Sequence, residues 1–142
     1  MNTSSSSSPP KSWTRFLPHA ARILMGLGFI VFGLNGFLDF LPPPPNLPEP
    51  VANFMKAMIE TRYMFPLIAG TQLVVGILLV INLFVPLALV LIAPVIVNII
   101  AFHLFLDPAS IVPGLIVLLL EIYLVWAYRD YFRSLFTLRT KP

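Results

Sequence analysis

The chain has 142 residues, of which 58% are hydrophobic and 11% are charged, with a formal net charge of +3. Soluble domains carry about 25% charged residues, so this composition excludes an ordinary soluble core. The length suits one domain, and the lack of cysteine excludes disulfides, thiolate ligands and cysteine redox chemistry.

The chain starts with a segment rich in serine and proline, MNTSSSSSPP. Such a segment has too little apolar surface to offset its ordering entropy, so we predict a disordered tail over residues 1–19. An apolar run from Ile23 to Leu41 follows and exceeds the roughly 7–15 residues of a signal-peptide core. It predicts a first transmembrane helix that is retained, in which recurring glycines favour close helix contact.

Four prolines, Pro42 to Pro45, end this helix because they lack backbone donors. The next stretch, VANFMKAMIET, has apolar residues at helical spacing and polar residues on its other side. It is too short to cross a bilayer and predicts an amphipathic helix in the interface, covering one mouth of the bundle. An anchoring role is favoured over a gating role.

From Tyr63 to Phe105 the chain is apolar for longer than one bilayer-spanning helix allows. Asn82 and Pro86 mark a break, which predicts two antiparallel neighbouring helices joined by a tight turn. The three later spans are predicted at Tyr63–Leu83, Pro86–Leu106 and Val112–Tyr128.

The sequence therefore predicts an all-α membrane protein, a four-transmembrane-helix bundle with a short interfacial amphipathic helix in its first outer loop. The membrane domain is expected over residues 20–133, followed by a basic tail over residues 134–142. Seven basic residues flank the side of the termini, and two lie on the opposite side: Lys11, Arg15, Arg22, Arg129, Arg133, Arg139 and Lys141, against Lys56 and Arg62. This imbalance predicts a bacterial inner-membrane protein with both termini in the cytoplasm, and no nucleic-acid partner.

One polar residue in each predicted span lies at a similar depth, roughly 9–14 Å below the outer surface. These residues are Asn35, Gln72, Asn98 and Glu121. Desolvation favours the neutral form of Glu121, because only amides share its depth. The layer has two interpretations, a structural hydrogen-bonded layer or a functional site.

His103 lies nearer the outer mouth and is an acid–base candidate. A single histidine without thiolates is a poor metal site, so no metal is expected. The candidate catalytic residues are therefore His103 and Glu121. The candidate cofactor-binding residues are Asn35, Gln72 and Asn98.

Three segments resemble the DoxX family of small four-helix membrane proteins, and the resemblance covers Ala20 to Arg133. These segments are IVFGLNGF at residues 30–37, LIAGTQLVVG at residues 67–76, and the stretch from Ala93-Pro94 to His103. The resemblance implies a membrane subunit associated with oxidoreductase systems, including quinone-coupled thiosulfate oxidation and oxidative-stress defence. Many members carry Lys at the position of Gly36 and Glu at the position of Gln72, so a role that needs those charges does not carry over.

The residues and the resemblance together suggest two classes of function. The first is a quinone-linked redox subunit that works with a membrane-associated or soluble oxidoreductase partner in the lipid bilayer. The second is a non-catalytic assembly or stabilising subunit. A transporter is less favoured, because four helices without evident inverted repeats make a small permeation unit unless copies of the chain assemble. Catalysis, the substrate and association with a second copy stay open at this stage.

Overall fold

The computed structural model describes residues 13–136, so the predicted disorder of residues 1–12 and the tail beyond Phe136 lie outside the described part. In that part the chain forms helices joined by loops, the longest of which is the proline-rich segment of residues 39–48 between the first two helices. Four helices are long and apolar enough to cross a membrane. The long helices are α1 (Trp13–Leu38), α3 (Met64–Ile81), α4 (Val85–Leu106) and α5 (Ile111–Ala127). The shorter elements are α2 (Glu49–Glu60) and the 3-10 helices η1 (Pro108–Ser110) and η2 (Arg129–Phe136). The predicted all-α fold with four crossings is confirmed.

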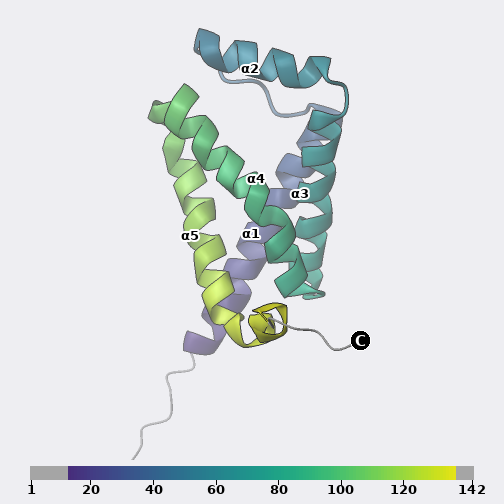
Figure 1. Cartoon of the computed structure of the whole chain (residues 1–142), viewed down its shortest axis with the longest axis vertical. Helices are drawn as coiled ribbons and strands as arrows, with labels where there is room; N and C mark the ends of the chain where they lie inside the picture. Colours follow the sequence, from purple (N-terminus) through teal and green to yellow (C-terminus); the bar gives the residue numbers. More distant parts are fainter. Residues whose placement is uncertain (1–12, 137–142) are drawn as a thin grey trace, which may run out of the picture.

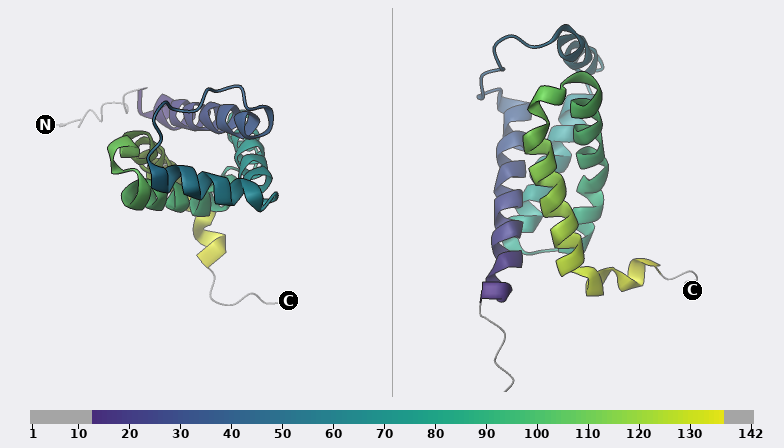
Figure 2. Two further views of the ribbon diagram at one scale, coloured as in Figure 1. Left: turned by 90° about the horizontal axis from the view of Figure 1, so that it is seen from above. Right: turned by 90° about the vertical axis from the view of Figure 1, so that its left-hand side faces the viewer.

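The four long helices run up and down and form a closed ring (Figures 1 and 2). In this ring α1 packs on α3, α3 on α4, α4 on α5 and α5 back on α1. The amphipathic helix α2 lies across one end of the bundle, as the sequence predicted, and η2 lies at the opposite end (Figure 1). We call the half of the bundle nearer to α2 the α2 half, and the half nearer to η2 the terminal half.

The first helix begins earlier than the sequence analysis expected. It starts at Trp13 and takes in residues 13–19, which the sequence analysis had placed in the tail. The helix includes Pro18 as its sixth residue, so its second turn lacks one backbone hydrogen bond. As a consequence, Arg22 lies nine residues into α1 and not on the flank of the bundle.

The predicted break between α3 and α4 is a turn of three residues. Asn82 ends α3 in the left-handed conformation with φ of 60°, a conformation that asparagine tolerates better than most residues. The Leu83 N–H donates to the Leu78 carbonyl at 3.0 Å, which satisfies one of the last carbonyls of α3. This turn makes α3 and α4 antiparallel neighbours.

The most extensive packing joins α1 to α3. A Cβ atom added at Gly33 would lie 2.7 Å from the backbone nitrogen of Leu73, and one at Gly76 would lie 2.7 Å from the Gly26 carbonyl oxygen. Only glycine permits this approach, as expected for close helix contact in lipid. Gly28, by contrast, faces open space.

The buried core lies mainly in the terminal half. Leu79 and Leu124 are fully buried within two turns of the helix ends there, and Phe132 of η2 packs against the same cluster. The core also includes Leu89, Ile92 and Ile96 of α4.

Candidate functional site

A cleft between α1 and α3 in the α2 half brings together two of the predicted site residues. Asn35 and Gln72 line it together with two phenylalanines, and its volume is about 210 Å³. The complete lining is Phe32, Asn35, Gly36, Phe65, Ile68, Ala69 and Gln72. Gly36 packs directly against Ala69, because a Cβ atom added at Gly36 would lie 2.5 Å from the Ala69 Cβ, so the two helices approach closely beside the cleft.

The cleft carries amide groups beside aromatic rings. Asn35 Oδ1 accepts a hydrogen bond from the Leu41 backbone N–H at 2.7 Å, which fixes the amide and ties the end of α1 to the following loop. Its NH₂ group retains donor capacity, and Gln72 supplies both a donor and an acceptor. The arrangement suits a flat apolar ring that carries carbonyl oxygens.

A second groove runs between α3 and α4, with a volume of about 320 Å³. Its lining is almost entirely apolar, and the Thr71 hydroxyl donates to the Leu67 carbonyl at 2.8 Å. Because its polar group is already paired with the helix backbone, this larger groove offers less basis for recognition than the cleft with two amides.

Asn98 lies outside the cleft. The buried face of α4 carries Leu89, Ile92 and Ile96, and Asn98 is exposed on the other side of the helix. The predicted layer of four polar residues is therefore not assembled into one site. Two members meet in the cleft, one faces outward and the fourth, Glu121, is buried in the bundle.

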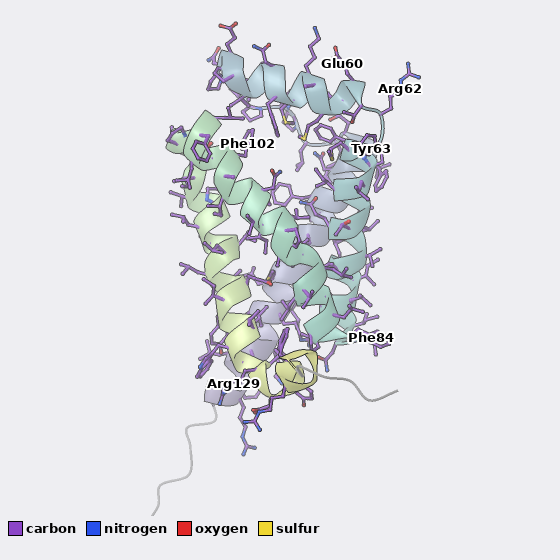
Figure 3. The ribbon with its side chains drawn as sticks, in the orientation of Figure 1. Glu60, Arg62, Tyr63, Phe84, Phe102 and Arg129 are labelled. Atoms are coloured by element: carbon purple, nitrogen blue, oxygen red, sulfur yellow. The ribbon has the colours of Figure 1, made fainter. Side chains whose placement is uncertain are left out.

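His103 lies in the last turn of α4, beside the connection that joins α4 to α5. Its Nδ1 lies 3.3 Å from Ser110 Oγ, and the Ser110 hydroxyl donates to the carboxylate of Asp107. The imidazole also packs edge-on against Phe102, which lies at the α2 end of α4 (Figure 3). Because the hydroxyl stands between the imidazole and the carboxylate, this chain of groups stabilises the turn and does not reproduce a serine-hydrolase arrangement. Among residues 13–136 no group of three His, Asp or Glu side chains could hold a metal ion.

Arg22 is the buried residue that the sequence analysis missed. Only 5% of its surface is exposed, and its Nη1 donates to the carbonyl oxygens of Leu79 and Val80. These carbonyls belong to the last turn of α3, where a cation stabilises the negative end of the helix dipole. The signal was available in the spacing, because Arg22 precedes Gly26 and Phe29 by one and two helical turns.

Glu121 is buried as predicted, with 6% of its surface exposed. It lies on the same face of α5 as Gly114 and Leu124, which are also buried. Its Oε2 atom has no hydrogen-bond partner in the described part of the chain. Glu121 belongs to α5, whereas the cleft is lined by residues of α1 and α3, so Glu121 lies apart from the cleft.

No curated protein and no solved structure matches the chain. The family model named DoxX matches residues 17–104, from the first turns of α1 almost to the end of α4. The matched region contains both amides of the cleft and leaves out α5 with Glu121. Because the match spans more than half of the 142 residues and the fold is a four-helix membrane bundle, the chain belongs to the DoxX family, as the resemblance implied.

Proposed function

We propose that this protein is a quinone-linked membrane subunit and that the α1–α3 cleft receives the quinone ring. The observation that carries the proposal is the meeting of Asn35 and Gln72 with Phe32 and Phe65 in one cleft. A quinone ring is flat and apolar with two carbonyl oxygens, so it needs aromatic contact and hydrogen-bond donors in a water-poor place.

Each part of the cleft has a role in this proposal. The amide NH₂ groups of Asn35 and Gln72 donate to quinone carbonyls, and the phenylalanines pack against the ring. The close contact of Gly36 with Ala69 brings the two helices together, so that both amides and both rings line one cleft. The cleft opens on the apolar surface of the bundle, which lets an isoprenoid tail remain among lipid chains.

The experiment measures the quinone that copurifies with the protein in mild detergent. We expect near-stoichiometric quinone in the wild type and about fivefold less in Gln72→Leu, since a lost hydrogen bond contributes about 1 kcal/mol. Thr71→Val is the matched control, because its neighbouring hydroxyl bonds its own helix backbone and faces the other groove. Wild-type protein without quinone, or equal loss in both variants, contradicts the proposal.

In this proposal the subunit passes reducing equivalents between the quinone and an oxidoreductase partner. It resides in a bacterial inner membrane with both termini in the cytoplasm. The burial of Arg22 removes one charge from the flank near the termini, yet six basic residues there still exceed the two of the opposite side. A cysteine placed at Ser5 should resist an impermeant reagent in intact cells, and one at Asn46 in the α1–α2 loop should react.

A second function, that of a non-catalytic assembly subunit, is favoured by Asn98. This amide is exposed near the middle of α4, and a polar side chain there gains stability from a hydrogen bond across helices. Cross-linking from Asn98→Cys in membranes tests this function, because the chain has no other cysteine. A specific cross-linked partner together with quinone-free protein would favour the assembly role over the redox role.

A further inference from the structure

Two buried side-chain atoms have no hydrogen-bond partner among the described residues, namely Arg22 Nε and Glu121 Oε2. One atom belongs to a cation and donates, and the other belongs to an acid and accepts. Both side chains are more than nine-tenths buried. Leaving either group unpaired inside a bundle is costly, because it loses its contact with water and gains nothing in return.

The two side chains come from helices that pack together. Arg22 shares the buried face of α1 with Met25 and Phe29, and Glu121 shares the buried face of α5 with Leu124. The lower parts of α1 and α5 lie side by side in the terminal half (Figures 1 and 2).

The hydrogen bonds of Arg22 place its guanidinium group beside the buried apolar cluster of the terminal half. Its Nη1 is bonded to the Leu79 carbonyl, and the Leu79 side chain belongs to the buried cluster that contains Leu124. Leu124 lies one helical turn from Glu121. Both side chains therefore adjoin members of the same buried cluster, Arg22 through Leu79 and Glu121 through Leu124.

We propose that Arg22 and Glu121 form a charge pair across the α1–α5 interface, closed by an internal water molecule. The water accepts from the Nε–H of Arg22 and donates to Oε2 of Glu121. Direct ion pairs in residues 13–136 join Lys56 to Glu60 and Arg133 to Asp130, so this pair is not in direct contact. A bridging water satisfies both atoms and is common in buried polar sites.

The pair has a structural consequence for the terminal half. Through one guanidinium group, Arg22 joins α1 to the last turn of α3 and to α5, so three helices meet at one charge. The buried Arg22 supplies a cation that the predicted layer of amides lacked, so in this pair Glu121 is ionised and not neutral as the sequence suggested. The two opposite charges offset part of each other's cost of burial inside the membrane.

A double-mutant cycle tests the pairing by thermal unfolding in detergent. Arg22→Gln and Glu121→Gln should each lower the Tm by roughly 5–15 °C, because each leaves one buried charge without its counterpart. Arg22→Gln retains an amide donor for the α3 carbonyls. The double variant should lose much less than the sum of the two single losses. Additive losses would overturn the pairing.

Exposed charges provide the matched control. Arg15 lies on the same helix but is exposed, so Arg15→Gln should combine additively with Glu121→Gln. If that combination were as non-additive as the Arg22 combination, the coupling would reflect net charge and the specific pair would be rejected.

Infrared difference spectroscopy keeps the test decisive if the Arg22→Gln variant does not fold. The carboxyl band of Glu121, identified by its loss in Glu121→Gln, should shift in Arg22→Lys and stay unchanged in Arg15→Lys. Exchange into H₂¹⁸O should also shift a water O–H band that Glu121→Leu abolishes. An unshifted carboxyl band would rule out the charge pair, and the absence of the water band would rule out the bridge.

Discussion

The two halves of the bundle are packed differently, although the same four helices build both. In the terminal half Leu79, Leu89 and Leu124 are fully buried, and Phe132 packs against their cluster. In the α2 half two helices line a cleft that contains two amides. Val51 is the one buried residue of α2. Figure 1 shows α4 leaving α3 and approaching α5 toward the α2 half.

This difference separates stability from recognition. The terminal half holds the apolar core and both buried charges, so most of the free energy of folding should come from it. The α2 half has space between helices and polar groups that face this space, as a binding site requires. Changes in the terminal half should affect the stability of the whole bundle, and those in the α2 half should act locally.

The largest expected effect tests the core of the terminal half. Leu124→Ala should lower the free energy of unfolding by about 2–5 kcal/mol, because a fully buried leucine leaves a cavity. Ile68→Ala, at a half-buried position beside the cleft, should cost about 1 kcal/mol or less. Chemical unfolding in detergent measures both changes, and equal losses would remove the distinction between the halves.

A glycine substitution tests the one feature that both halves share, the close packing of α1 on α3. Gly33→Ala should destabilise the protein by about 1–3 kcal/mol, because the new methyl group would meet the α3 backbone. Gly28→Ala on the same helix faces open space and should be neutral or slightly stabilising. Thermal unfolding of the two variants compares them, and similar Tm values would contradict the close packing.

A smaller and local effect is expected where α2 meets the bundle. The rings of Phe54 in α2 and Phe102 in α4 lie 5.5 Å apart, a contact that contributes about 0.5–1.5 kcal/mol. Phe54→Ala should increase hydrogen exchange in α2 and leave the Tm nearly unchanged. Ile59→Ala, at an exposed position of the same helix, should leave the exchange of α2 as it is. Global destabilisation by Phe54→Ala would show that α2 belongs to the main core.

A further small effect is expected at the turn between α3 and α4. Asn82 has φ of 60°, so Asn82→Ala should cost about 1 kcal/mol, whereas Asn82→Gly should be tolerated. Thermal unfolding distinguishes them, and an Asn82→Ala variant as stable as wild type would indicate that the turn adopts another conformation.

Several features of the candidate site followed from the sequence and others did not. Glu121 was expected to be buried because an acid inside an apolar span must face the bundle, and it is buried. Depth along the helices grouped Asn35, Gln72, Asn98 and Glu121. Depth alone says nothing about the direction in which a side chain points, and Asn98 faces outward.

Arg22 illustrates the second limit of the sequence. It stands before a long apolar run, where a basic residue usually marks a membrane flank. The start of α1 at Trp13 places it inside the helix instead, and its partners are carbonyls 57 and 58 residues away in the chain. The spacing from Gly26 and Phe29 indicates the face of α1 on which Arg22 lies, but no local pattern reports a contact of that separation.

The sequence by itself determined the number of crossings, the position of α2 and the turn at Asn82. These follow from the length of apolar runs, from helical periodicity and from proline and asparagine, all of which act over a few neighbouring residues. Only the tertiary structure decided which polar residues meet, because this depends on how the helices rotate and tilt against one another. The glycines of α1 and α3 set that geometry, so the cleft with Asn35 and Gln72 and the burial of Arg22 beside α3 arise together from packing.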